Sequence, residues 1–105
     1  MISNADEELS EDEPLAQGIV WVFQGAGARL PSGLFTTRER AESWIAECRL
    51  SGLLSAYPLD IGLYEWAVTT GKFTPKSDEG NMPGFIETFN RPVDHFHYES
   101  GRRVA

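Results

Sequence analysis

Two histidines separated by one residue are the side chains in this 105-residue chain best suited to chemistry, and they are its only imidazoles. On a β-strand, His95 and His97 share one face, because strand side chains alternate between the two sides. Glu99 falls on that same face. Two imidazoles and a carboxylate are donor types that a metal ion or a general base uses.

A complete metal site needs more ligands than this row supplies. Side chains two positions apart on a strand start about 7 Å from each other, and no second cluster of potential ligands stands elsewhere in the sequence. We therefore predict no metal and no cofactor, and a solvent-facing row of His95, His97 and Glu99. Phe96 and Tyr98 then pack inward. A small metal-binding protein or enzyme centred on His95 and His97 is the alternative hypothesis.

Other candidate motifs favour structure over chemistry. Gly25-Ala26-Gly27 follows a strand, but the third glycine of a dinucleotide loop would fall at Leu30, and no helix begins there. Cys48 lies on the apolar stripe of a helix, where cysteine behaves as a small hydrophobic residue. The sequence thus lacks a catalytic set, and we predict that the protein is not an enzyme.

The element with the strongest pattern is a helix over about 37–49. Thr36 as N-cap and Glu39 three residues later form a capping box. A buried face then follows at i, i+3, i+4 and i+7, the helical spacing, and it consists of Ala41, Trp44, Ile45 and Cys48. Gly52 is placed to end the helix in the left-handed conformation.

Strand patterns surround this helix. The expected strands span 18–23, 29–35, 53–57, 63–70 and 93–99, with a short helix over 84–90. Pro31 and Gly33 push the second strand to a sheet edge, and the third and fourth strands form a hairpin. The resulting order, β-β-α-β-β-(short α)-β, predicts an α+β fold: an antiparallel sheet of about five strands with one main helix packed on it.

Charge divides the chain into a tail and a body. Six acidic residues within 6–13 meet no basic residue, whereas the remainder carries nine basic against ten acidic residues. Such a segment favours disorder, so we predict a disordered acidic N-terminal tail over 1–15 and a single α+β domain over 16–105. A docking role for the tail, towards a basic partner, is the second interpretation.

Composition also bounds the partners and the compartment. The body has no basic stripe, which argues against nucleic-acid binding. The longest apolar run, 19–23, is too short to span a membrane, and the start shows no signal-peptide pattern. One cysteine fits a reducing compartment, so we expect a cytoplasmic protein with no membrane partner.

A set of residues across about 18–101 resembles a family of small bacterial proteins catalogued as a domain of unknown function. The resemblance rests on Trp21-Val22-Phe23, Phe35-Thr36-Thr37-Arg38-Glu39 with Ala41 and Trp44-Ile45, Ser51-Gly52-Leu53-Leu54, Tyr64 with Trp66, and His95-Phe96-His97-Tyr98-Glu99. It implies a bacterial, stand-alone domain and brings no assigned activity.

The leading functional hypothesis is a non-enzymatic protein-binding module, with an immunity-type inhibitor of a toxin as its most specific form. The expected partner-binding residues are His95, His97 and Glu99 on the outer strand face. Trp66 joins them as a rival anchor, because Trp and Tyr dominate interface hot spots. A homodimer formed through an exposed strand edge is the third reading.

Overall fold

The computed structural model describes residues 18–76, 78–90 and 93–105. The predicted tail over 1–15 lies outside these residues. The described chain divides into two compact units, one formed by Gly18 and 58–90, the other by 19–57 and 93–105. We call them the helical unit and the sheet unit. That 16–105 forms a single domain stays a prediction.

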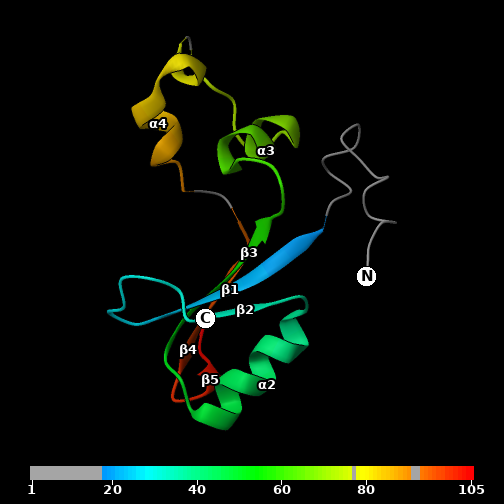
Figure 1. The fold of residues 1–105 in the computed structure, drawn as a ribbon, viewed down its shortest axis with the longest axis vertical. Coiled ribbons are helices and arrows are strands. Elements are labelled where there is room, and N and C mark those ends of the chain that lie inside the picture. The colour runs from blue at the N-terminus through cyan, green and yellow to red at the C-terminus, as the bar shows by residue number, and fades with distance from the viewer. Residues whose placement is uncertain (1–17, 77, 91–92) are drawn as a thin grey trace. The chain divides into compact units, whose positions relative to one another are not determined.

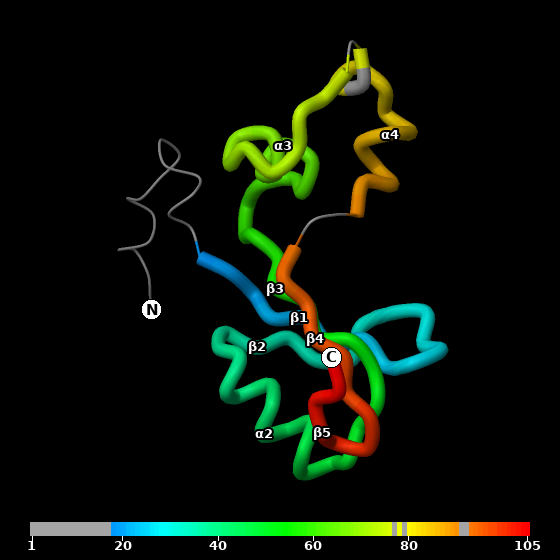
Figure 2. The backbone as a smooth tube through the Cα atoms, turned by 180° about the vertical axis from the view of Figure 1, so that it is seen from behind, coloured from blue at the N-terminus to red at the C-terminus, as the bar shows by residue number. Residues whose placement is uncertain are grey.

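The sheet unit contains five strands and one long helix. The strands are β1 (Ile19–Gly25), β2 (Gly33–Phe35), β3 (Gly52–Pro58), β4 (His95–Glu99) and β5 (Arg102–Arg103), and the helix is α2 (Arg38–Cys48). The sheet order is β2-β1-β3-β4-β5. Figure 1 shows α2 lying along one face of this sheet, and Figure 2 shows the β1–β2 loop projecting away from α2. The predicted α+β fold is confirmed.

Strand register decides which side chains meet α2. Trp21 stands opposite Phe35 and Phe23 opposite Gly33, while Phe96 stands opposite Leu54. This face holds the core, which consists of Phe23, Ala41, Ile45, Leu54 and Tyr98, with Trp21, Phe35, Trp44, Leu50 and Phe96 packed against it. Trp44 is half-buried and contacts Phe23 edge-on, with ring centroids 5.6 Å apart.

Both ends of α2 differ from the prediction. Thr37, not Thr36, is the N-cap, and its Oγ1 accepts a hydrogen bond from the Arg40 N–H at 3.1 Å. The residue at the third helical position is therefore Arg40, which cannot accept a return bond as Glu39 would in a capping box. At the other end Arg49, not Gly52, adopts the left-handed conformation, with φ 57°.

This C-terminal turn also explains why the predicted burial of Cys48 is wrong. The helix ends at Cys48, which is exposed. Leu50 N–H donates to Ile45 O at 2.9 Å and Arg49 N–H donates to Ala46 O at 3.2 Å, the pattern of a Schellman turn. The turn brings Leu50 against the core, so Leu50 provides the apolar contact expected of Cys48.

The helical unit replaces the predicted fourth strand. Residues Leu63–Thr69 form α3, so the predicted hairpin of the third and fourth strands is wrong, and β3 instead pairs with β4. Tyr64 and Ala67 are its buried residues, at helical spacing. The hydroxyls of Thr69 and Thr70 donate to carbonyls four residues earlier, at 2.7 and 2.8 Å. Apolar residues at 64, 66 and 68 fit a strand period, whereas those at 64, 67 and 68 fit a helical one.

An aromatic cluster stabilises the helical unit. A short 3₁₀ turn, η2 (Glu79–Asn81), and the short helix α4 (Pro83–Glu87) follow α3, close to the helix expected over 84–90. The Tyr64 ring meets those of Phe85 and Phe89 edge-on, with centroids 5.8 and 5.5 Å apart, and Phe73 completes the cluster. Packing of these rings favours the helical form of 63–69 over the extended one.

Gly52 is required by a close approach between β1 and β3. A Cβ at this position would collide with the carbonyl oxygen of Gln24, and it would lie 2.7 Å from Phe23 Cζ and 2.8 Å from Gly25 Cα. Two of these atoms belong to the backbone and cannot move without shifting the strand. At Gly25, by contrast, a Cβ would find ordinary contacts at 3.8 Å.

We predict that Gly52→Ala lowers the free energy of unfolding by about 1–3 kcal/mol, the usual cost of overpacking. Gly25→Ala is the matched control in the facing strand and should change it by about 0.5 kcal/mol or less. Urea denaturation monitored by tryptophan fluorescence measures both. Equal stability of the two variants would show that the strands do not approach as described.

Candidate functional site

The expected outer row of β4 is present. His95, His97 and Glu99 are exposed, Phe96 is half-buried, and Tyr98 is buried with 4% of its surface accessible. The alternation predicted for this strand therefore holds. The imidazole rings of His95 and His97 lie 5.4 Å apart, nearly perpendicular to each other. His95 Nδ1 lies 3.1 Å from the carbonyl oxygen of Val93.

Neighbouring strands extend this row into a surface. Leu53 stands directly opposite His97, and Arg102 stands opposite Glu99. Val104 N–H donates to His97 O at 2.8 Å and continues the pairing beyond β5. We call the set Leu53, His95, His97, Glu99 and Val104 the histidine face. It lies on the side of the sheet opposite α2, because Phe96 and Tyr98 point the other way.

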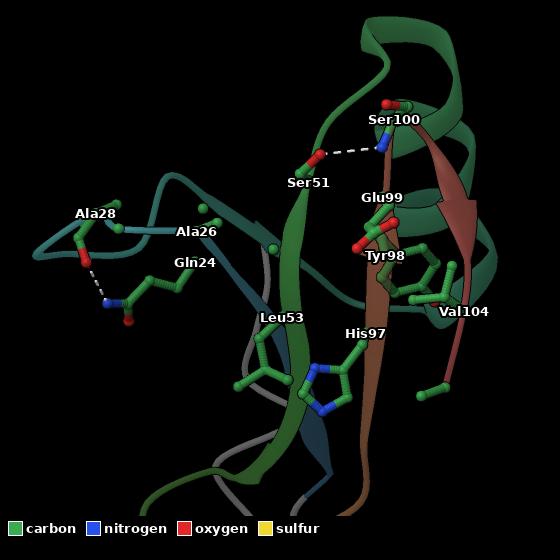
Figure 3. Close-up of a pocket in the computed structure, with 14 residues that line it drawn as sticks. Gln24, Ala26, Ala28, Ser51, Leu53, His97, Tyr98, Glu99, Ser100 and Val104 are labelled. Atoms are coloured by element: carbon green, nitrogen blue, oxygen red, sulfur yellow. Dashed lines mark hydrogen bonds between the residues drawn. The ribbon is translucent and has the colours of Figure 1, made fainter.

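An open groove of about 890 Å³ adjoins the histidine face. Figure 3 shows Leu53 and His97 side by side, Glu99 beyond them and the Gln24–Ala28 segment forming the opposite wall. Hydrogen bonds donated by backbone N–H groups hold both walls. Ala26 N–H donates to Ser51 O at 3.0 Å, and Ser100 N–H donates to Ser51 Oγ at 2.9 Å. The groove is therefore built by elements that are fixed in the fold.

The fourth predicted site residue lies elsewhere. Trp66 belongs to α3 in the helical unit, is half-buried, and has Lys72 Nζ 5.9 Å from its ring centroid. The structure thus brings three of the four predicted residues together on one strand. The structure adds Leu53, Val104 and the Gln24–Ala28 segment to the site. The sequence did not indicate them, because cross-strand register and the short β5 leave no local sequence pattern.

Cys48 and the histidines do not form a nucleophile–base pair. Cys48 ends α2, whereas His95 and His97 lie on the opposite face of the sheet. In the parts of the chain that the structure describes, no three His, Cys, Asp or Glu side chains are grouped to hold a metal ion. The same parts contain no helix long and apolar enough to cross a membrane.

A polar contact across the core holds β4 in this orientation. The Tyr98 hydroxyl donates to Glu42 Oε2 at 2.5 Å, and Arg38 Nε donates to the same oxygen at 3.3 Å. The hydrogen bond from Tyr98 is the main reason that the pKa of Glu42 lies below its usual value. Burial, followed by the bond to Glu42, raises the pKa of Tyr98 to about 12.

Aromatic and cationic groups complete this contact. The guanidinium carbons of Arg38 and Arg103 lie 4.2 and 4.3 Å from the centre of the Phe96 ring, a cation–π geometry. Trp21 stacks on Phe96 with centroids 6.2 Å apart. Arg103 therefore joins β5 to the inner side of β4.

We predict that Tyr98→Phe lowers the free energy of unfolding by about 1–2 kcal/mol near neutral pH, because a hydrogen bond to a charged group is lost. The expected value is moderate because Glu42 is partly exposed and solvent screens its charge. The folded protein holds the Tyr98 proton more tightly than the unfolded chain, whose tyrosine pKa is 10.0. This stabilisation is complete below pH 10 and is lost as the pH rises towards about 12.

Chemical denaturation from neutral pH to pH 12 measures the difference between wild type and Tyr98→Phe. Tyr57→Phe controls for general tyrosine ionisation, because Tyr57 is half-buried and forms no hydrogen bond through its hydroxyl with the described residues. A stability difference between wild type and Tyr98→Phe that stays constant to pH 12 would contradict the assigned contact.

Comparison with known proteins places the chain in a family but not in a functional class. No curated protein and no solved structure matches the sequence. A family model matches residues 20–104, nearly the whole described chain and close to the range expected from the sequence. The chain therefore belongs to the family described as Domain of unknown function (DUF7710).

Proposed function

We propose that this protein is a non-enzymatic protein-binding module whose partner docks on the histidine face. The observation that carries the proposal is the arrangement of β4. Its inner side chains are fixed to α2, and its outer ones, His95, His97 and Glu99, are exposed beside a groove. Such an arrangement offers a rigid surface, and rigid surfaces bind with less loss of conformational entropy.

Exposed apolar side chains on the same side of the sheet as the histidine face support a macromolecular partner. Val104 exposes 55% of its surface, and Leu34, on the same side of the sheet as Val22, exposes 66%. Apolar surface interrupted by imidazole and carboxylate groups is typical of non-obligate interfaces, which mix apolar and polar area. A partner protein that covers this side of the sheet would bury these residues.

A more specific form of the proposal is an immunity-type inhibitor that neutralises a toxin by covering its functional surface. The small size of the domain and the absence of a catalytic set in its sequence favour this form. A bacterial cytoplasmic setting fits it, as does the single cysteine. A toxin-domain gene beside the gene of this protein would identify the partner class.

A second candidate function is metal binding at His95 and His97. The contact between His95 Nδ1 and the Val93 carbonyl is the observation that favours it. Metal-binding histidines commonly donate one ring N–H to a carbonyl, which leaves the other nitrogen free for the ion. The remaining ligands would come from outside the described residues, since these contain no cluster of three His, Cys, Asp or Glu side chains.

To test the leading proposal, the chain is used to capture partners from its native host, and affinities are then measured with a His95→Ala, His97→Ala double variant. We expect the double variant to bind at least about tenfold more weakly, as for hot-spot residues. Binding of the wild type should also change between about pH 5 and 8, where histidine side chains in general change charge.

Ser43→Ala is the control, because Ser43 is exposed on α2, on the other side of the sheet. It should bind as the wild type does. If the double variant binds as tightly as Ser43→Ala at every pH, the histidine face is not the docking surface.

The rival function is tested by metal analysis. Protein purified without an affinity tag should contain no stoichiometric zinc or nickel by mass spectrometry, and the double variant should give the same result. A full equivalent of either metal in the wild type, lost in the double variant, would replace the leading proposal with the second one.

A further inference from the structure

The charge of the groove is carried by one side chain. Among its fourteen lining residues, Glu99 is the only one with an acidic side chain, and none has a lysine or arginine side chain. The remaining lining is apolar or neutral, with Leu53 and Val104 beside His97. The groove therefore combines apolar side chains with a single acidic one.

The Glu99 side chain forms no hydrogen bond or ion pair with the described residues. Arg102 stands directly opposite it on β5, yet no ion pair or hydrogen bond joins the two side chains, and Arg102 does not line the groove. Glu42 offers the contrast within the same unit, because Tyr98 and Arg38 both donate to its carboxylate. The Glu99 carboxylate is therefore free to accept a donor from another molecule.

The shape of the groove favours an extended segment over a compact ligand. It is open to solvent and runs between the Gln24–Ala28 wall and the ends of β4 and β5. Its volume of about 890 Å³ is at the upper end of ordinary small-molecule sites. A strand advances about 3.3 Å per residue, so a few extended residues span such a groove.

The sequence supplies a second, independent charge argument. The six acidic residues within 6–13 give the chain most of its net charge of −7. A strongly negative protein attracts positively charged partners over long range and accelerates their association. Basic partners are favoured both by the whole molecule and by the groove.

We propose that the groove binds an extended basic segment of the partner protein, with a lysine or arginine side chain donating to the Glu99 carboxylate. Apolar residues flanking that side chain contact Leu53 and Val104. This inference rests on the proposed function and adds the chemistry of the partner to it.

The test titrates the full-length, ¹⁵N-labelled chain with three capped heptapeptides that differ only at the central residue. The peptide scaffold is Ala-Val-Ala-X-Ala-Val-Ala, with X as arginine, norleucine or glutamate. We expect the arginine peptide to shift the amide signals of Gly25–Ala28, Leu53 and 97–100. The glutamate peptide should bind at least about fivefold more weakly, the scale of one partly exposed charge pair.

Three neutralising variants separate the effect of the Glu99 carboxylate from the effect of net charge. Glu99→Gln should bind the arginine peptide about fivefold more weakly than the wild type does, and should bind the norleucine peptide with unchanged affinity. Glu87→Gln changes the net charge equally, but at an exposed position in α4, and should retain the wild-type affinity. Arg102→Gln removes the nearby cation and should not weaken binding. Thermal melts check that each variant is folded.

Several results would overturn the inference. These are equal binding of the arginine and glutamate peptides, shifts confined to residues outside the groove, no shift with any peptide, or equal losses in Glu99→Gln and Glu87→Gln. Concentration-dependent shifts of the groove signals without peptide would identify a second copy of the chain as the occupant. A captured native partner could bind Glu99→Gln as tightly as the wild type but bind the double histidine variant weakly. That result would support the proposed function and refute the inference that the groove binds a basic segment.

Discussion

The attachment of β4 to α2 is the constraint on which the rest of the site depends. Tyr98 and Phe96 are held on the inner side of the strand by Glu42, by two arginines and by the apolar core. Because strand side chains alternate, fixing these two fixes the direction of their neighbours. The histidines and Glu99 face outward as a consequence of what lies beneath them.

Local patterns in the sequence predicted those parts of the fold that local interactions decide. The periodicity of Ala41 and Ile45 identifies α2, and alternation along 95–99 identifies both faces of β4. The start of α2 was harder to predict from the sequence, since either of two adjacent threonines can cap the helix. In the structure it is Thr37 whose side chain caps the helix.

Tertiary contacts decided what the sequence left ambiguous. Residues 63–69 satisfy both a strand and a helix period, and contacts of Tyr64 with distant rings resolve the choice. The groove could not be predicted because it unites segments near 25, 52, 98 and 104. Its formation depends on strand order and register, which a single sequence does not specify. For the same reason, Trp66 lies in α3 and not in the predicted fourth strand.

The connection between β3 and β4 has a consequence for folding kinetics. Ser55 and His95 are paired neighbours in the sheet, yet the whole helical unit intervenes between them in sequence. Bringing them together closes a long loop, whose entropic cost grows only by about 0.6 kcal/mol for each doubling of length. Pairing of β1 with β2 requires a much shorter closure. We therefore expect the first hairpin and α2 to form first, and β4, with the histidine face, to join the sheet late.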